Sequence, residues 1–272
     1  MNSKRRSVFI RSLVYLCSGF TLLILLFMIG YILVKGVPFL SRDLFSLNYT
    51  SENCSVIPAL VNTLSMVLIA LLIACPLGIG SAIYLVEYAG KGNRFVKIVR
   101  MTTEILTGIP SIIYGLFGML LFVEFFKWGY SLIAGASTVA IMILPTIMRT
   151  TEETLISVPD SFREGSFGLG AGKFRTVCKI ILPSAIPGIL SGIILATGRV
   201  VGETAAVIYT AGTVAQIPQN LFGSGRTLAI HMYVLSSEGL HTNQAFATAV
   251  VLLVMVIGIN ALASLLARKI KR

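Results

Sequence analysis

Charged residues are scarce in this chain: only 12% of its 272 residues are Asp, Glu, Lys or Arg, and 56% are apolar. A soluble protein of this length would need many more polar side chains to cover its surface. The composition therefore excludes a soluble globular domain. Instead it predicts an all-α protein whose helices cross a membrane several times.

Cysteine and histidine are also rare, with four cysteines and two histidines. Two cysteines lie in apolar runs and a third lies in a segment that we assign to the inner side, so we predict no disulfide within the chain. No group of residues has the spacing of a metal site, and no Ser/His/Asp set suggests a membrane-embedded hydrolase. We therefore expect this chain to hold no cofactor and to catalyse no reaction of its own.

Long apolar runs, by contrast, are abundant. Six of them are long enough to cross about 30 Å of hydrocarbon as helices. The predicted spans are Leu13–Val34, Ala59–Val86, Ile105–Phe126, Tyr130–Met148, Ile180–Tyr209 and Gln244–Ala267. Two prolines inside these runs, Pro76 and Pro110, predict bends or breaks.

The basic residues predict the orientation of these spans. If the N-terminus is cytoplasmic, most of the 22 Lys and Arg residues fall on inner segments. The positive-inside rule then selects six spans with both termini in the cytoplasm. This topology accounts for the net charge of +11, so we expect membrane lipid, and not nucleic acid, as a partner.

The chain divides into an anchor and a larger block. Its basic start resembles a signal peptide, but the apolar run that follows is too long, so we expect a retained anchor helix and outer loop over residues 1–57. A five-span block follows over residues 58–268. Within residues 210–243, the nine-residue piece TLAIHMYVL is too short to cross a bilayer and predicts an interfacial or re-entrant segment on the outer side.

The inner loop at about 149–183 carries the most specific signal. Thr150 with Glu153 has the spacing of a capping box, and a second such pair follows Pro159. Gly170 suits a helix end or a left-handed turn before a further helix. The loop therefore predicts a compact helix-turn-helix element, and the general alternative is an amphipathic connector that contacts lipid headgroups.

Part of this loop resembles the signature of binding-protein-dependent ABC importer permeases. Glu164 is followed six residues later by Gly170 and then by an apolar run that ends in Pro183. The chain departs from the signature at the two residues after Glu164, where the family usually has alanines. The resemblance implies the type I importer permease fold, with a coupling helix that enters a cleft on a separate ATPase. The implied coupling residues are Arg163, Glu164, Gly170 and Pro183.

Nucleotide chemistry is assigned to that partner. The stretch GAGKF imitates part of a phosphate-binding loop, but Phe174 stands where a Ser or Thr is required. The resemblance therefore implies that ATP and Mg²⁺ bind to the ATPase and not to this chain.

Arg199 and Glu203 interrupt the fifth apolar run near its centre, four residues apart. On one continuous helix they share a face. A charge at this depth costs about 2.5–3.5 kcal/mol, and such residues face a bundle interior or a water-filled path. Two interpretations follow: an ion pair that only neutralises itself, or an arginine that Glu203 orients toward a passing oxyanion, with Thr204 beside it.

The region around this pair resembles the permeases of inorganic phosphate importers, and the PstA type in particular. The resemblance rests on GRVVGETAAVIYTAG together with ILTGIPSIIYGLFG, and it extends over most of the five-span block. It implies that residues 58–268 are a permease domain and that Arg199 and Glu203 are transport residues. It also implies a bacterial inner-membrane location and four partners: a PstC-type permease, a PstB-type ATPase dimer, an external PstS-type binding protein and inorganic phosphate.

Two other functions stay open at this point. An ABC permease for sulfate or molybdate would carry the same loop signature. An ion-coupled secondary transporter or channel would work without an ATPase, but it would be expected to show more intramembrane acids or an inverted repeat.

Overall fold

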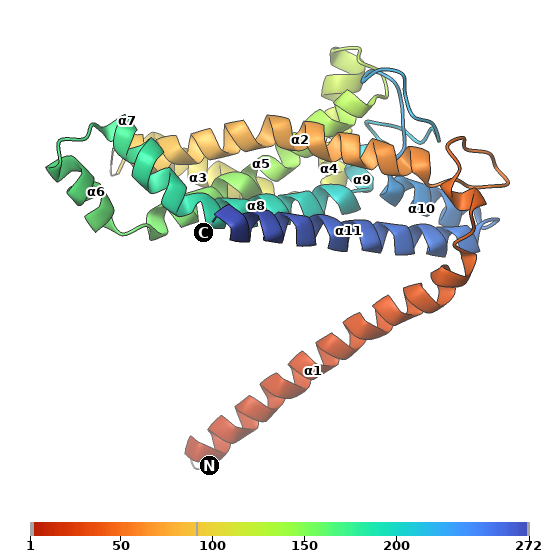
Figure 1. Ribbon diagram of the computed structural model, residues 1–272, viewed down its shortest axis with the longest axis horizontal. Coiled ribbons are helices and arrows are strands. Elements are labelled where there is room, and N and C mark those ends of the chain that lie inside the picture. The colour runs from red at the N-terminus through yellow and green to blue at the C-terminus, as the bar shows by residue number, and fades with distance from the viewer. Residues whose placement is uncertain (1–2, 91, 271–272) are drawn as a thin grey trace.

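The computed structural model describes residues 3–90 and 92–270, and every regular element in that part of the chain is helical (Figure 1). The elements are α1 (Ser3–Gly36), η1 (Val37–Phe39), η2 (Asp43–Phe45), α2 (Ile57–Ile83), η3 (Tyr84–Tyr88), α3 (Arg94–Thr107), α4 (Ser111–Gly118), η4 (Met119–Phe125), α5 (Leu132–Ser157), α6 (Asp160–Gly168), α7 (Lys173–Thr176), η5 (Val177–Ile181), α8 (Leu182–Gly202), α9 (Ala205–Ile208), α10 (Leu228–Glu238) and α11 (Thr242–Ile270). The predicted all-α class is confirmed. Three of the basic residues assigned to the inner side, Lys91, Lys271 and Arg272, lie outside the described residues.

Five helical stretches are long and apolar enough to cross a membrane, and a bent pair of helices makes a sixth candidate. The five are Phe9–Phe39, Ile57–Tyr88, Leu132–Ser157, Lys173–Gly202 and Thr242–Leu265. Each predicted span overlaps one of these six. The number of predicted spans is therefore confirmed, although two of them differ in form.

The first span stands apart from the rest of the molecule. In Figure 1, α1 diverges from the bundle along its length, and no part of its most apolar window is buried. It meets α11 near its C-terminal end, where Tyr31 packs edge-on against Phe246 with ring centroids 5.7 Å apart. Gly36 abuts the backbone of Phe246 so closely that a Cβ has no room there. The apolar surface of α1 is thus left for lipid or another polypeptide to cover.

The centre of the bundle is α5. Its most apolar window is 72% buried, against 33% or less for every other continuous candidate span. It packs against both α2 and α8. Glycines of α8 allow this approach, because Gly192 lies against Thr150 and Gly188 lies against Thr154, with no space for a Cβ at either position.

The third span is broken. α3 and the α4–η4 segment are bent by 104° across residues 108–110, so the span predicted over Ile105–Phe126 consists of parts of two helices. Pro110 has an extended ψ of 139°, and a proline disfavours the helical conformation of the residue before it. The Tyr114 hydroxyl donates to the Leu106 carbonyl at 2.8 Å and so ties the two halves together. The predicted break at Pro110 is confirmed, whereas Pro76 lies inside the uninterrupted helix α2.

The outer segment predicted over residues 210–243 contains one helix, α10, of 11 residues. The Thr227 hydroxyl caps its start by accepting from the Ile230 N–H, and Gly239 ends it with a left-handed φ of 72°. α10 packs on α11 and is not among the candidate spans. A short, non-spanning helix in this place is therefore confirmed.

Candidate functional site

Arg199 lies in the last turn of α8, where it is partly buried. All four ion pairs between described residues involve other side chains. Its guanidinium therefore has no carboxylate partner in the described part of the chain. A guanidinium stays charged at every physiological pH and offers donors in a planar fork that matches an oxyanion.

Glu203 does not share a helix face with Arg199, and this corrects the sequence prediction. α8 ends at Gly202, and Glu203 has an extended backbone with φ −73° and ψ 125°. Its buried carboxylate turns forward and accepts from the Ala206 backbone N–H at 3.0 Å, which caps the short helix α9. The predicted helix over Ile180–Tyr209 is therefore two helices with a break, and the interpretation as a self-neutralising pair is wrong.

A groove lies beside this site without including its charges. It is an open groove of 690 Å³ between α1, α4, α9, α10 and α11, and Thr204 is the one predicted path residue that lines it. Most of its lining is apolar, including Ile208 and Phe246. Such a surface suits lipid or another helix better than an anion, so we place the chemistry at Arg199 and not in this groove.

The inner loop contains the predicted short helix. α6 begins after Pro159 and ends before Gly170, whose left-handed φ of 79° turns the chain toward α7. Glu164 is exposed on α6, and Pro183 is exposed near the start of α8. Large apolar side chains at this tip are exposed as well, with Leu169 at 91% and Phe174 at 73%. The tip thus presents an acid and apolar groups at one end of the molecule.

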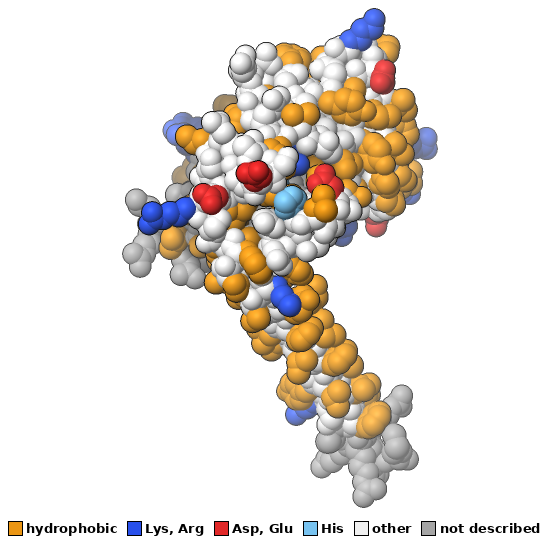
Figure 2. All heavy atoms as spheres, turned by 90° about the vertical axis from the view of Figure 1, so that its right-hand side faces the viewer, with side chains coloured by type: hydrophobic (Ala, Val, Ile, Leu, Met, Phe, Trp, Pro, Cys, Tyr) orange, Lys and Arg blue, Asp and Glu red, His pale blue; other side chains and the backbone are white. Residues whose placement is uncertain are grey.

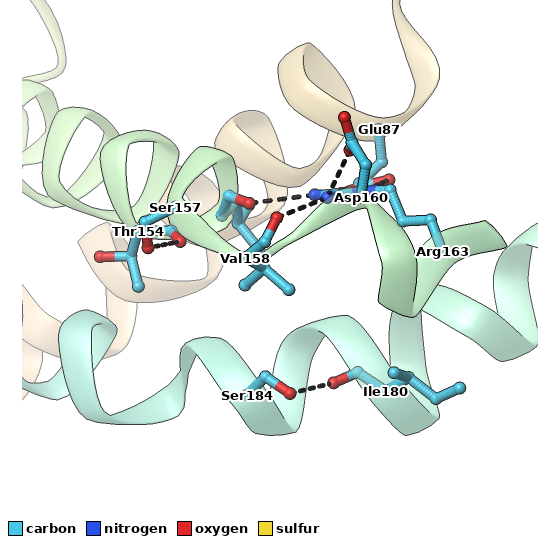
Figure 3. A network of polar contacts seen from close by, with 9 residues as sticks. Glu87, Thr154, Ser157, Val158, Asp160, Arg163, Ile180 and Ser184 are labelled. Atoms are coloured by element: carbon cyan, nitrogen blue, oxygen red, sulfur yellow. Dashed lines mark hydrogen bonds and ion pairs between the residues drawn. The ribbon is translucent and has the colours of Figure 1, made fainter. Parts of the chain in front are cut away.

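Arg163 points inward from α6 and ties this helix to the bundle (Figure 3). Its Nη2 donates to a Glu87 carboxylate oxygen at 2.7 Å and to the Leu155 carbonyl at 3.0 Å. Its Nη1 donates to the Val158 carbonyl at 2.8 Å and to Asp160 at 3.0 Å. The hydrogen bonds to Glu87 raise the pKa of Arg163. One side chain therefore joins α6, the end of α5 and η3.

Two features of the inner side differ from the sequence prediction or escaped it. Thr150 does not begin a helix, because α5 continues through it to Ser157 and its hydroxyl donates back to the Thr146 carbonyl. Arg100 of α3 pairs with the largely buried Glu152 of α5 at 2.5 Å. A carboxylate in the last turns of an apolar helix was the available signal for that pair.

The described chain is thus a bundle of apolar helices with broken spans, and the short helix α6 is held at one end of it by Arg163. The chain belongs to the family described as binding-protein-dependent transport system inner membrane component, which it matches over residues 74–272. It is therefore a multi-pass membrane protein of an ABC importer.

Several curated proteins are similar to this chain. A probable ABC transporter permease of Bacillus subtilis, YqgI, is 34% identical over 88% of this chain and 86% of its own length. The phosphate transport system permease PstA 1 of Mycobacterium tuberculosis is 36% identical over 76% of this chain and 69% of its own length. PstA of Haemophilus influenzae is 33% identical over 84% of this chain and 82% of its own length.

Solved structures confirm the fold. A chain of the MetNI methionine ABC transporter, in an inward-facing conformation, aligns with a TM-score of 0.61 at 20% identity, covering 89% of this chain and 97% of its own. A chain of a bacterial alginate ABC transporter, solved with an alginate-bound periplasmic protein, aligns at 0.69 and 17% identity, covering 99% and 96%. The predicted type I importer permease fold is thus correct.

Proposed function

We propose that this chain is the PstA-type permease subunit of an ATP-driven phosphate importer and forms half of the translocation path. The observation that carries the proposal is Arg199, a permanent cation on a predicted membrane span with no carboxylate partner among the described residues. A charge at membrane depth costs free energy, and residues that carry one typically mark the path of a substrate or ion. A cation in this place therefore favours cargo of opposite sign. The similarity to phosphate permeases of two organisms supports phosphate as that cargo.

Within this proposal, Arg199, Glu203 and Thr204 contribute to the path in different ways. Arg199 presents donors to the oxyanion. Glu203 fixes the break at Gly202 through its hydrogen bond to Ala206, so that the backbone beside the arginine is open rather than helical. Irregular backbone at membrane depth is stable where it lines a cavity or is buried in protein. The homologous PstC-type subunit supplies the other half of the path.

The tip of the inner loop is the proposed contact with a PstB-type ATPase dimer, which binds ATP and Mg²⁺. Glu164 and the exposed Leu169 and Phe174 form the surface that docks. Arg163, Gly170 and Pro183 determine the shape of the loop and transmit the motion of the ATPase to the membrane helices. An external PstS-type protein delivers phosphate to the opposite end. In this proposal the protein lies in the bacterial inner membrane with both termini in the cytoplasm, which the distribution of basic residues supports.

ATP-dependent uptake of labelled phosphate by the assembled complex in vesicles tests the proposal. Replacing Arg199 with Gln should reduce uptake to background, whereas Arg199→Lys, which keeps the charge but loses the fork, should retain part of it. Arg42→Gln, at an exposed position of the outer loop, is the matched control and should transport normally. Undiminished uptake by an intact complex carrying Arg199→Gln would rule out the role of Arg199.

The closest competing function is transport of another oxyanion. Sulfate and molybdate match the same guanidinium chemistry, so both belong in the assay as competitors and as labelled substrates. Uptake of either one without uptake of phosphate would transfer the assignment to that anion. Phosphate uptake that continues without ATP would favour an ion-coupled transporter instead.

A further inference from the structure

A second arginine without a counter-ion lies at the outer end of the bundle, directly before α10. Arg226 is only 4% exposed, and its Nε and Nη2 are enclosed with no hydrogen-bond partner. None of the ion pairs between described residues includes it. A buried guanidinium in this condition opposes folding unless an anion or a polar group compensates it.

The groups around Arg226 do not provide that compensation. Its guanidinium carbon lies 4.6 Å from the centre of the Tyr49 ring, which in turn packs edge-on against His231. Burial and the Arg226 charge lower the pKa of His231 to about 3, so the imidazole is neutral at physiological pH. The Cys54 thiol nearby stays protonated, because burial raises its pKa. The charge of Glu238 also raises the pKa of that thiol, but Glu238 forms no ion pair with Arg226. The guanidinium therefore lies against an aromatic ring and has no carboxylate partner among the described residues.

The contacts of Arg163 indicate which kind of group the unpartnered Nε and Nη2 of Arg226 can bind. Nε and Nη2 form the same side of a guanidinium, and in Arg163 these two atoms donate together to the Glu87 carboxylate, at 3.2 Å and 2.7 Å from Oε1. In Arg226 the same two atoms have no partner. Bidentate recognition of an oxyanion uses this pair of donors.

The enclosure of Arg226 limits what can fill that edge. Asn62 of α2 fixes the loop over residues 216–226 that carries Arg226, because its side-chain amide donates to the backbone carbonyls of Gln216 and Arg226. A water molecule could satisfy one donor, or the orphaned Asn62 Oδ1, but it brings no charge. A carboxylate on a large docking protein would have to reach the enclosed Nε and Nη2 atoms, which a small ion can do more easily. Figure 2 shows acidic side chains on this end of the molecule, but none of the ion pairs between described residues joins an acid to Arg226.

We propose that Arg226 is the centre of a second oxyanion site, separate from Arg199, which binds one small inorganic oxyanion of the phosphate type at the outer end of the bundle. Tyr49 orients the guanidinium, and the Nε/Nη2 edge receives the anion when the loop over residues 216–226 moves. The site goes beyond the proposed transport function, and it does not depend on which anion the importer carries.

Equilibrium dialysis of labelled phosphate against the full chain in lipid nanodiscs tests this site. The chain should carry Arg199→Gln, so that binding at the predicted path does not contribute. We expect one saturable phosphate site in this background and its loss when Arg226→Met is added. The matched control is Arg42→Met in the same background, since Arg42 is an exposed outer arginine, and it should leave binding unchanged.

Thermal unfolding separates an anion site from a structural arginine. If Arg226 waits for an anion, phosphate should raise the Tm of the Arg199→Gln chain but not of the chain that also carries Arg226→Met. In phosphate-free buffer of equal ionic strength, Arg226→Met should unfold at the same or a higher temperature, because it removes an uncompensated charge. A lower Tm without phosphate, or an equal phosphate response in both chains, would overturn the proposal.

A fluorescence readout keeps the test decisive if Arg226→Met fails to fold. Trp128 is the chain's single tryptophan. A Tyr49→Trp, Trp128→Phe, Arg199→Gln chain places the one fluorophore beside the intact Arg226. Its emission should change saturably as phosphate replaces chloride. A flat titration, or the absence of saturable binding in dialysis, would mean that no phosphate binds at Nε and Nη2 of Arg226. Either result would overturn the proposed second site, whatever the uptake assay shows for Arg199.

Discussion

Three arginines of this chain meet their surroundings in three different ways. Arg163 is fully engaged by Glu87, Asp160 and backbone carbonyls. Arg199 is partly buried on a predicted span with no carboxylate partner among the described residues, and Arg226 is buried in an outer loop with two orphaned donors. Since arginine cannot shed its charge, the last two stay cations in places where charge is costly. Both therefore point to anions.

His231 should make the stability of the protein depend on pH. It is fully buried, with Nε2 near the Cys54 carbonyl at 3.2 Å and an unpartnered Nδ1. Its pKa is about 3 in the folded protein, against about 6.5 when unfolded. The unfolded chain therefore takes up a proton that the folded chain does not between these values. The free energy of unfolding should fall by up to about 1.4 kcal/mol per pH unit as the pH drops from 6.5 toward 3.

Thermal unfolding between pH 4 and pH 7.5 measures this dependence. His231→Gln should lose the part of the pH dependence that comes from protonation of His231, whatever the Tm of the variant at pH 7.5. His241→Gln, at the partly exposed position beyond α10, is the control and should keep the wild-type slope. If wild type and His231→Gln show parallel curves, the buried imidazole is not the cause of the slope.

At the residue scale, the sequence revealed charges but not their partners. Arg199 could be found because it interrupts an apolar run. Its supposed pairing with Glu203 failed because four-residue spacing brings side chains together only while the helix continues, and α8 ends at Gly202. Arg226 gave no signal, since it sits among polar loop residues and its burial arises from contacts with distant residues such as Asn62 and Tyr49.

At the scale of elements, the sequence predicted a helix break only where the chemistry of a single residue causes it. Pro110 removes a backbone donor and restrains its neighbour, so the break in the third span was predicted, although its 104° angle was not. The break after Gly202 depends on the competing cap that Glu203 gives to α9. Glycine alone does not fix such a position, because many glycines in these spans serve packing.

The contact of α5 with α8 depends on glycines that admit threonine. Gly192→Ala should lower the free energy of unfolding by about 1–3 kcal/mol, because its methyl group overlaps the side chain of Thr150. Thermal unfolding of the purified chain measures the loss. Adding Thr150→Ala should recover part of it.

Gly198→Ala is the matched control for this contact. Gly198 lies on the same helix, and nothing comes within 4 Å of an added Cβ there. Its substitution should be neutral or slightly stabilising, since alanine is the better helix former. Equal losses from Gly192→Ala and Gly198→Ala would mean that the effect is not steric.

For the whole molecule, hydropathy predicted the number of spans but not their places in the bundle. α5 has the lowest hydropathy of the five continuous candidates, 1.7, and is the most buried. The reason is physical: a helix surrounded by protein can carry threonine, serine and glutamate, whereas lipid-facing helices must be apolar. A lower hydropathy among otherwise similar spans was therefore an available signal for the central helix.

Coupling across the whole molecule should depend on Arg163. Because removing the arginine alone would leave Glu87 buried and uncompensated, the test uses Arg163→Met together with Glu87→Met. The complex should still hydrolyse ATP, but transport per ATP should fall roughly 2- to 30-fold, the size of about 0.5–2 kcal/mol of coupling free energy. Parallel assays of uptake and ATP hydrolysis in vesicles measure this ratio.

Arg175→Met provides the control for this prediction, since Arg175 is an exposed basic residue of the same loop. It should leave the ratio unchanged. A normal ratio in the double variant would show that α6 transmits motion without its tie to η3.

The isolation of α1 bears on how the protein is made. α1 satisfies its own backbone hydrogen bonds, and no part of its most apolar window is buried by the rest of the chain. It therefore needs no contact with later segments to be stable in lipid. α5 differs from α1, because the helices before and after it in the sequence bury most of its apolar window. During synthesis the first helix can settle as soon as it emerges, whereas the central one reaches its final surroundings only once α8 has been translated.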